Sequence, residues 1–418
     1  MNLPNALAEI IGQAFVSAEP AACAQFAVQG CAPGCVAAPG SAEELAAVLA
    51  AAHTQGAAVV PWGGGTQQLI GNPPAQIDLV VRTERLQRVL IHEPGDLTIS
   101  VEAGMTLGAL RSHLAAHGQM LPVDAPLPER ATIGGLIATA MDGPRRLGYG
   151  TLRDLLIGIQ VVDAAGHTSK AGGMVVKNVS GFDMMKLYHG SFGTLALIAS
   201  ANFKLLPAPR ESTALLCRFG ARAAAFRFLA DLHASQLTPT AAEYLNPAAL
   251  QQLGLGPGHA VFVVAEGLAQ AVARHAAELG LLAAYSAGQA EQRADHRVLL
   301  QRIADLPQTL QLGEQDAVIK LSILPGDLEA ALERMEAYAP LVLISARALD
   351  GVAYARLAGS DAAQLAMLAA ELPGLHWVAT TLADVPRWGD LGEGAALMRQ
   401  IKHEFDPQGR LNPGRYVV

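Results

Sequence analysis

Short apolar runs alternate with longer amphipathic stretches along the chain, and this alternation predicts a mixed α+β protein. A helix should begin after Ser41, with Glu44 three positions later as its capping partner, and end at Gly56. The apolar run 57–60 that follows predicts a buried strand. Further strands are expected at 77–81, 86–92, 97–101, 155–162 and 195–205, and further helices at 1–16, at 107–117 and from Thr132 onward.

The second half of the chain carries a repeated pattern. A β-α-β-β-α-β module of ferredoxin-like order is predicted from elements at 317–324, 326–338, 341–346, 352–357, 360–372 and 376–380. An earlier copy is expected over 213–282, with strands at 213–219 and 260–265, so that two units build one antiparallel sheet. We therefore predict a first domain over 1–209, a second over 210–393, and a segment 394–418 that returns to the first.

A glycine loop follows the strand predicted at 57–60. The segment Pro61–Gln67 reads Pro-Trp-Gly-Gly-Gly-Thr-Gln, and three successive glycines let several backbone N–H groups point at one spot. Such a nest binds an anion such as a pyrophosphate, although a surface turn would also explain it. The predicted helix precedes this strand, whereas a Rossmann unit places its helix after the loop, so a nicotinamide-type fold is disfavoured.

A second segment is dense with small residues. The run 131–139 reads Ala-Thr-Ile-Gly-Gly-Leu-Ile-Ala-Thr, with Thr132 placed as a helix N-cap. Gly134 and Gly135 would let the first helical turn pack against a flat ring system. Close packing of the helix on a strand would need glycine for the same steric reason.

Composition narrows the class of protein. The 418 residues are 51% hydrophobic and 16% charged, with a net charge of −8, and carry no basic cluster interleaved with aromatic residues. This balance argues against nucleic acid as a partner. No apolar run reaches membrane-spanning length, and Met1–Phe15 lack the basic start of a secretory signal. A cytoplasmic location is therefore the default expectation.

Two patterns invite a metal-site interpretation. Cys31 and Cys35 lack the paired spacing and the further ligands of a zinc or iron–sulfur site, so we interpret them as two thiols in a turn. His113 and His117 stand at i and i+4 and could face one metal ion. Because the sequence shows no third ligand near them, an exposed or capping role is expected for both, and no metal site is predicted.

Several blocks, taken in order, resemble one family. The match runs over residues 37–209 and is similar to the FAD-binding domain of the vanillyl-alcohol oxidase type, also called the PCMH type. Its blocks are 61–67, 101–104, 131–135, 145–150, 177–183 and 190–194. Residues 405–415 resemble the closing motif of the family, and 172–179 with 204–209 most resemble the smaller, E-type FAD-binding subunit of bacterial glycolate oxidase.

The resemblance implies a two-lobed FAD-binding domain with an antiparallel α+β cap domain. It assigns the pyrophosphate to the glycine loop, the ribityl and isoalloxazine parts to the 132–143 region, the adenosine end to Ile198, and a contact toward the flavin to Asn412. The FAD is expected to be noncovalent, because no His lies in the loop and no Cys lies between positions 36 and 216. The residues expected to bind FAD are Pro61, Trp62, Gly63, Gly64, Gly65, Thr66, Gln67, Pro122, Thr132, Gly134, Gly135, Thr139, Gly143, Gly150, Gly193, Thr194, Ile198 and Asn412.

One feature of the family's catalytic flavoproteins is missing. Those subunits carry paired histidines in the cap, and no His-x-His occurs in this chain. Oxidation of a hydroxy acid by a flavin needs a base for the hydroxyl proton and a cation for the carboxylate. Candidates are Tyr354 and Arg356 on one face of a strand, Arg347 on its neighbour, and His376 on another strand, although surface or packing roles would also explain each.

Three functions follow from these observations. The first is an FAD-binding subunit of a heteromeric glycolate oxidase, which oxidises glycolate to glyoxylate with a catalytic flavoprotein subunit and an iron–sulfur subunit. Such a subunit would be cytoplasmic, or peripheral at the inner membrane through its complex. The second is a self-sufficient FAD-dependent dehydrogenase of another small 2-hydroxy acid or alcohol. The third is a noncatalytic scaffold whose FAD site has decayed, which the intact glycines disfavour.

Overall fold

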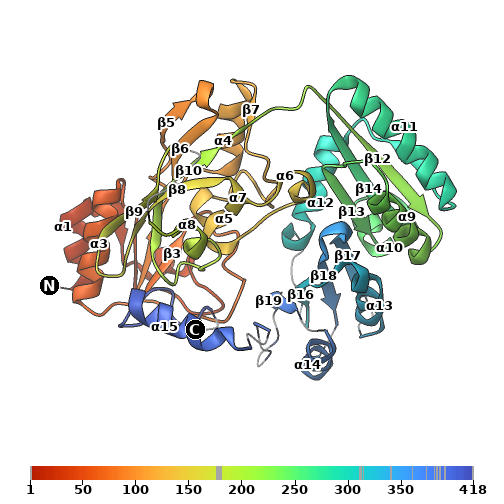
Figure 1. Cartoon of the computed structure of the whole chain (residues 1–418). Coiled ribbons are helices and arrows are strands. Elements are labelled where there is room, and N and C mark those ends of the chain that lie inside the picture. The colour runs from red at the N-terminus through yellow and green to blue at the C-terminus, as the bar shows by residue number, and fades with distance from the viewer. Residues whose placement is uncertain are drawn as a thin grey trace.

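Two lobes stand side by side in the computed structural model (Figure 1). The N-lobe comprises residues 2–209, and the cap lobe comprises residues 211–380. The structure describes residues 2–175, 181–309, 313, 315–338, 341–359, 361–372, 374–380, 382, 385, 387–389 and 392–416. The block expected at 177–183 therefore lies largely outside the described residues. The mixed helix and sheet architecture agrees with the predicted fold class.

The first sheet of the N-lobe has the strand order β1-β2-β4-β3 and supports the glycine loop. Strands β2, β4 and β3 run parallel, and α1 and α3 bury Leu7, Leu45 and Leu49 against them. Ser41 caps α3 as predicted, because its Oγ accepts a hydrogen bond from the N–H of Glu44 at 3.1 Å. The elements are α1 (Leu3–Ile11), β1 (Val16–Ser17), α2 (Pro20–Ala24), β2 (Cys35–Ala37), α3 (Ala42–Thr54), β3 (Val59–Trp62) and β4 (Leu79–Arg82).

The second sheet of the N-lobe is antiparallel, in the order β5-β6-β10-β8-β9. Alternate residues such as Ile99 and Phe203 bury one face against α4 and α5, while Leu197 and Ala199 pack against the first sheet. Its elements are β5 (Val89–Glu93), β6 (Thr98–Glu102), α4 (Leu107–Ala115), α5 (Ile133–Thr139), β8 (Leu156–Val162), β9 (Thr168–Gly172) and β10 (Leu197–Lys204). Shorter elements are β7 (Gln119–Met120), α6 (Arg146–Tyr149), α7 (Leu152–Leu155), α8 (Met185–Tyr188) and β11 (Leu206–Pro207).

The cap lobe is one antiparallel sheet built from two ferredoxin-like units. Its order β15-β12-β14-β13-β17-β18-β16-β19 joins the units through their second strands, where Glu243 lies opposite Arg347. The first unit contains β12 (Glu211–Phe219), α9 (Arg222–Ala234), β13 (Ala241–Leu245), α10 (Pro247–Gln252), β14 (His259–Gly267), α11 (Ala269–Tyr285) and β15 (Gln289–Gln292). The second contains β16 (Ala317–Ser322), α13 (Leu328–Tyr338), β17 (Leu341–Arg347), β18 (Val352–Ala358), α14 (Ala362–Glu371) and β19 (Leu375–Thr380).

The element order predicted for the second unit is confirmed, and the repeat exists in the first. That first unit extends to Gln292, beyond the expected end near 282, because β15 adds an edge strand next to β12. All four residues of β15 are exposed, and the strand lacks the alternation of apolar and polar residues that would predict it from the sequence.

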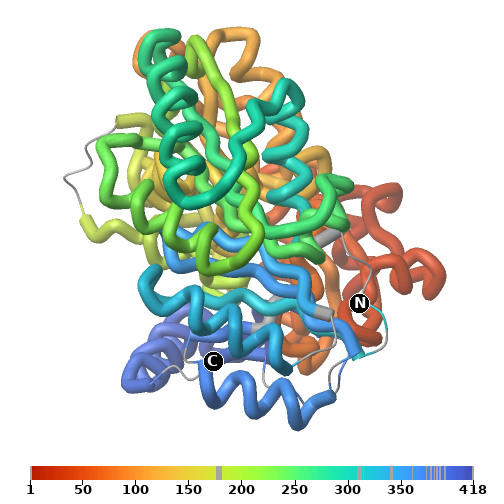
Figure 2. The backbone as a smooth tube through the Cα atoms, turned by 90° about the vertical axis from the view of Figure 1, so that its right-hand side faces the viewer, coloured from red at the N-terminus to blue at the C-terminus, as the bar shows by residue number. Residues whose placement is uncertain are grey.

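The two faces of the cap sheet have different partners. Helices α9, α11, α13 and α14 cover the outer face, and α12 (His296–Thr309) covers the inner face of the first unit. The inner face of the second unit packs on the N-lobe, where Val318, Val352 and Tyr354 share a core with Leu136 and Ile137. Figure 2 shows the cap lobe in front of the N-lobe. At the junction between the lobes, β16 and β18 of the cap therefore pack against the end of α5 in the N-lobe.

The segment after the cap lies against the N-lobe. Helix α15 (Gly394–Phe405) lies below the N-lobe in Figure 1, and the tail then runs beside β3. The N–H of Val59 donates to the carbonyl of Arg410 at 2.8 Å, and the N–H of Asn412 donates to the carbonyl of Val59 at 2.7 Å. In the described part of the chain, no helix has the length and apolar character that crossing a bilayer requires.

Cys31 and Cys35, interpreted as two thiols of one turn, lie in different elements. Cys23, Cys31, Cys35 and Cys217 are all free thiols. Cys31 forms a turn with Val28 through an isolated β-bridge, and Cys35 begins β2, where burial raises the pKa of its thiol to about 12.

Candidate functional site

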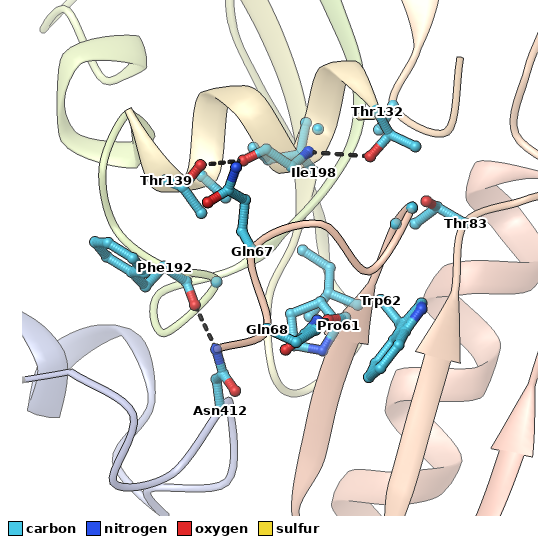
Figure 3. A pocket seen from close by; sticks show the side chains of 18 of the residues that line it. Pro61, Trp62, Gln67, Gln68, Thr83, Thr132, Thr139, Phe192, Ile198 and Asn412 are labelled. Atoms are coloured by element: carbon cyan, nitrogen blue, oxygen red, sulfur yellow. Dashed lines mark hydrogen bonds between the residues drawn. The ribbon is translucent and has the colours of Figure 1, made fainter. Parts of the chain in front are cut away.

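A cleft of about 770 Å³ lies in the N-lobe where the two sheets meet. Its walls are the glycine loop after β3, the start of α5, the start of β10 and the C-terminal tail (Figure 3). Part of this space is open to solvent, and its lining combines apolar side chains with a few polar groups, as is typical of small-molecule and cofactor sites. We therefore treat the cleft as the candidate binding site.

The glycine loop is held in place by the segment before α5. A Cβ on Gly64 would overlap the carbonyl oxygen of Arg130, and one on Gly63 would overlap Thr132 Oγ1. Gly65 has a φ of +69°, which a residue with a side chain rarely adopts. The sequence suggested that a ligand requires these glycines, but the structure shows that contact between two protein segments already requires them.

The position of a Cβ also decides between the two interpretations of Gly134, which were packing against a ring system and close packing of the helix on a strand. A Cβ on this residue would lie 2.8 Å from the Cβ of Ala103, at the end of β6. Close packing of α5 on a strand therefore explains Gly134. Thr132 caps α5 as predicted, because its Oγ1 accepts a hydrogen bond from the N–H of Gly135 at 3.3 Å.

Polar groups at the cleft are left available for a ligand. Within the described residues, the backbone N–H groups of Gly64, Gly65 and Thr66 donate no hydrogen bond to the protein. Two buried side-chain oxygens, Thr83 Oγ1 and Asn412 Oδ1, also lack a partner there. Adjacent free N–H groups suit an anionic group, and the two oxygens suit polar atoms farther along the same ligand.

The C-terminal tail fixes the loop on its other side. Asn412 Nδ2 donates to the carbonyl of Phe192 at 2.5 Å, which Figure 3 shows as a dashed line. The guanidinium of Arg415 donates to three loop carbonyls, those of Gln68, Ile70 and Asn72, at 2.7–2.8 Å. Burial, and then the charge of Arg387, lower the pKa of Arg415 to about 10. This arginine is consequently a structural clamp, although it lines the cleft.

Fourteen of the eighteen residues expected to bind FAD line this cleft, namely Pro61, Trp62, Gly63, Gly64, Gly65, Thr66, Gln67, Thr132, Gly134, Gly135, Thr139, Gly193, Ile198 and Asn412. The four others lie outside its lining. A Cβ on Gly143 would overlap the carbonyl of Asp124, and Gly150 adopts a φ of +77° after α6. Thr194 Oγ1 donates to the carbonyl of Ser191 at 2.7 Å, and Pro122 is buried beside β7. Backbone geometry accounts for both glycines.

Sequence reasoning missed eight residues that line the cleft: Gln68, Thr83, Ala103, Ala138, Phe192, Ala196, Leu197 and Arg415. Four of them, Gln68, Ala138, Phe192 and Leu197, adjoin residues that were identified, so widening each motif by one position would have found these four. Thr83 follows β4 and could be placed only by the parallel pairing of β3 with β4.

A set of buried charges joins the two lobes next to the cleft. Arg347 on β17 forms a short ion pair with Asp142, which follows α5, and its Nε lies 3.5 Å from Glu243 Oε1. Arg146 also contacts Asp142, at 2.6 Å. Burial opposes ionisation of Asp142, but the charges of Arg347, Lys320 and Arg146 outweigh it and hold the pKa of Asp142 below its ordinary value. We call Asp142, Glu243 and Arg347 the seam cluster.

Glu243 is the unusual member of the seam cluster. Burial raises its pKa to about 7, although the charge of Arg347 and a hydrogen bond from Ser345 oppose the shift. A pKa near neutral pH is typical of groups that exchange protons in a functional site, and also of a carboxyl at a buried interface.

A second polar set lies on the same inner face of the cap sheet. Lys320, Tyr354 and His376 are directly paired across β16, β18 and β19, so their side chains share one face. Burial, and then the charge of Lys320, lower the pKa of His376. Tyr354 is buried with its hydroxyl 4.0 Å from Met141 Sδ, and Lys320 Nζ lies 5.9 Å from the Tyr354 ring centre. We call these three residues the cap-face set.

The arginines predicted as catalytic candidates are both held by carboxylates. Arg347 belongs to the seam cluster, and Arg356 Nη2 lies 2.6 Å from Asp316 Oδ2. Neither lines the cleft, and Tyr354 does not line it either. Their catalytic roles stay predictions.

The expectation that His113 and His117 have no third partner is wrong. His92 on β5 lies against both of them, and one nitrogen of each imidazole lies within 4.8 Å of the others. The sequence could not show this, because His92 comes close to α4 only when β5 pairs antiparallel with β6, the strand that leads into α4.

Comparison with known proteins identifies two matching family models. The model described as an FAD-binding domain matches residues 33–183, and the model described as the C-terminal domain of FAD-linked oxidases matches residues 390–416. The first covers the glycine loop and α5, and the second covers the tail that carries Asn412 and Arg415.

Relatives match the chain at low identity. The D-2-hydroxyglutarate dehydrogenase of Xanthomonas citri pv. viticola is 30% identical over 423 residues, covering 92% of this chain and 89% of the relative. The glycolate oxidase subunit GlcE of Escherichia coli is 36% identical over 154 residues, covering 37% of this chain and 43% of that subunit. Among solved structures, p-cresol methylhydroxylase with bound substrate has a TM-score of 0.78 at 13% identity, covering 99% of this chain and 96% of that one.

The family models match the glycine loop, α5 and the tail, which form most of the cleft, and the first relative matches nearly the whole chain. The cleft offers free backbone donors for a pyrophosphate and unpartnered polar atoms for the rest of a dinucleotide. The residues present therefore fit FAD. This chain belongs to the family of FAD-linked oxidases with a PCMH-type FAD-binding domain, and it is an FAD-dependent oxidoreductase.

Proposed function

We propose that the chain acts in the oxidation of a small 2-hydroxy acid, as the FAD-binding subunit of a heteromeric glycolate oxidase. Its partners would be a catalytic flavoprotein subunit and an iron–sulfur subunit. The names of two relatives support the substrate class, because both D-2-hydroxyglutarate and glycolate are 2-hydroxy acids. Similarity to GlcE supports the subunit role.

Bound FAD would accept a hydride from the carbon that carries the substrate hydroxyl. In this proposal, the chain's own residues hold that cofactor: the backbone of Gly64, Gly65 and Thr66 binds the pyrophosphate, and Thr83 and Asn412 meet polar atoms along its length. The clamp of Arg415 holds the segment that directly follows the glycine loop, through the carbonyls of Gln68, Ile70 and Asn72. The FAD is noncovalent, because no His or Cys lines the cleft in the described part of the chain.

The observation that carries the subunit role is that both cap arginines already form ion pairs within the chain. A substrate carboxylate needs a cation, and Arg347 and Arg356 each already contact a carboxylate of the chain. To bind substrate, Arg347 would have to abandon the buried Asp142, which would then lose a partner at substantial cost. A catalytic site on a partner subunit avoids this cost.

The cap-face set favours a second candidate function, a self-sufficient dehydrogenase. No carboxylate contacts Lys320 among the described residues, and His376 Nδ1 is buried without a partner there. Lys320 could meet a substrate carboxylate, and the lowered pKa keeps His376 neutral and able to accept the hydroxyl proton. The near full-length match to D-2-hydroxyglutarate dehydrogenase supports this candidate.

Anaerobic reduction of the purified chain distinguishes the two. Glycolate and D-2-hydroxyglutarate are added separately to the FAD-loaded protein while the flavin absorption bands are recorded. The subunit proposal expects both bands to persist in the isolated chain and to bleach when co-purified partner subunits are present. Bleaching of the isolated chain that is lost in Lys320→Met, with FAD retained, would establish the second candidate. A chain that does not bind added FAD would contradict both.

A further inference from the structure

Three histidines form a compact cluster on the edge of the N-lobe. His92 lies on β5, His113 lies in the last turn of α4, and His117 follows that helix. His113 Nε2 lies 3.0 Å from His92 Nδ1, and the ring centres are 4.7–5.4 Å apart. None of the three lines the FAD cleft. We call this group the histidine cluster.

A fourth residue fixes the orientation of His92. Gln119 on β7 has its Nε2 at 2.8 Å from the carbonyl oxygen of Pro94, which can only accept a hydrogen bond. The side-chain oxygen of Gln119 must therefore face His92 Nε2, at 2.9 Å, so that this nitrogen carries the proton. His92 Nδ1 consequently presents a lone pair toward the other two rings. Hydrogen bonding of this kind orients histidines that bind metal ions.

No carboxylate pairs with any of the three histidines in the described residues. Their rings face one another instead, and imidazole nitrogens gathered in this way are common ligands of metal ions.

We propose that His92, His113 and His117 bind a divalent transition metal ion, for which zinc is the best candidate. Three neutral nitrogen ligands suit zinc, nickel or copper and do not suit magnesium or calcium, which prefer oxygen. The facing nitrogens of His113 and His92 are 3.0 Å apart, which is close enough for both to reach one zinc ion at about 2.0–2.1 Å. His117 is exposed, so the fourth coordination position opens toward solvent.

The ion would tie together elements of the N-lobe near the point where the chain enters the cap. It would join β5 to the end of α4, and Gln119 would extend this link to β7. Strand β7 pairs with β11, the last N-lobe strand before the chain enters the cap, with Gln119 opposite Pro207. The proposed role is therefore structural, at a site that is independent of FAD and of the substrate.

Calorimetric titration with zinc chloride tests the proposal. The FAD-loaded protein is first stripped of metal with a chelator, and His117→Ala is compared with His167→Ala, a matched control. His167 is an exposed histidine on a turn, and among the described residues its ring pairs with Asp163 alone. We expect one zinc per chain for the wild type and for His167→Ala, and an affinity at least about 100-fold lower for His117→Ala. Gln119→Leu should lower the affinity by about 10–100-fold.

The flavin spectrum reports folding in every variant, because the cleft shares no residue with the histidine cluster. His117 is exposed, so its replacement should leave that spectrum unchanged. Stoichiometric zinc binding by His117→Ala with wild-type affinity would overturn the proposal. Absence of one-to-one binding by the wild type would overturn it equally.

Discussion

Breaking the seam cluster from its acidic side should destabilise the protein strongly. Asp142→Asn removes the main partner of Arg347, whose side chain is only 8% exposed. Loss of one partner from a buried ion pair costs about 3–5 kcal/mol, because the other charge stays buried. Glu243 remains 3.5 Å from Arg347 Nε and compensates partly, so we expect a cost near the lower end, about 3 kcal/mol.

The change in melting temperature depends on what unfolds. With an unfolding entropy of about 2.1 cal/mol/K per residue, 3 kcal/mol lowers the melting temperature by about 3 °C if all 418 residues unfold together. If a cap of about 180 residues unfolds separately, the same cost lowers its melting temperature by about 8 °C. Differential scanning calorimetry of the FAD-loaded protein measures both the shift and the number of transitions.

The double variant Asp142→Asn with Arg347→Met supplies the control. Removing both charges leaves no unpaired buried cation, so its stability should return to within about 1 kcal/mol of the wild type. Arg347→Met alone should cost less than Asp142→Asn, because Asp142 keeps Arg146 at 2.6 Å. If the double variant is as unstable as the sum of the single variants, the two residues do not act as a buried pair and the reasoning fails.

Four further predictions follow from the site. Folding raises the pKa of Glu243 from 4.5 to about 7, so the proton on this carboxyl stabilises the folded state fully below pH 4.5. This stabilisation is lost as the pH rises through about 7. The melting temperature of Glu243→Gln, which cannot ionise, should therefore increase relative to that of the wild type between about pH 5 and pH 8. Gly64→Ala should cost about 1–3 kcal/mol and lower the flavin-to-protein absorbance ratio, whereas Gly95→Ala, whose Cβ meets no atom within 4 Å, should leave the ratio unchanged. Arg415→Met removes three hydrogen bonds to loop carbonyls and should weaken FAD retention in equilibrium dialysis, with an unchanged dissociation constant contradicting the clamp. Acid precipitation should release all the flavin into the supernatant, and yellow colour in the pellet would contradict noncovalent binding.

Local signals in the sequence predicted much of the fold. The caps Ser41 and Thr132 were identified from residue type and spacing, because a cap depends on a hydrogen bond to a residue three positions away. The second ferredoxin-like unit was identified because its apolar runs alternate cleanly between strand and helix lengths. The glycine loop and the closing motif were identified from consecutive residues, and the structure brings them together at one cleft.

The features that sequence reasoning missed are relationships between distant segments. Glu243 and Arg347 meet because two units join through β13 and β17, which no local pattern announces. His92 reaches His113 through a strand pairing, and Arg130 constrains Gly64 through a loop contact. Charged residues in these places read as surface positions in a linear sequence, because burial by a distant segment has no periodic signature.

The clamp of Arg415 on the glycine loop affects how the protein matures on the ribosome. Arg415 Nη2 and the Gln68 carbonyl are 347 positions apart, and the whole cap is synthesised between them. At about 5–20 residues per second, the loop emerges roughly 20–70 s before its clamp. During that interval the N-lobe sheets can form, but the loop carbonyls have no guanidinium to hold them. Stable cofactor capture is therefore a late event, and nascent chains stalled within the cap should be colourless.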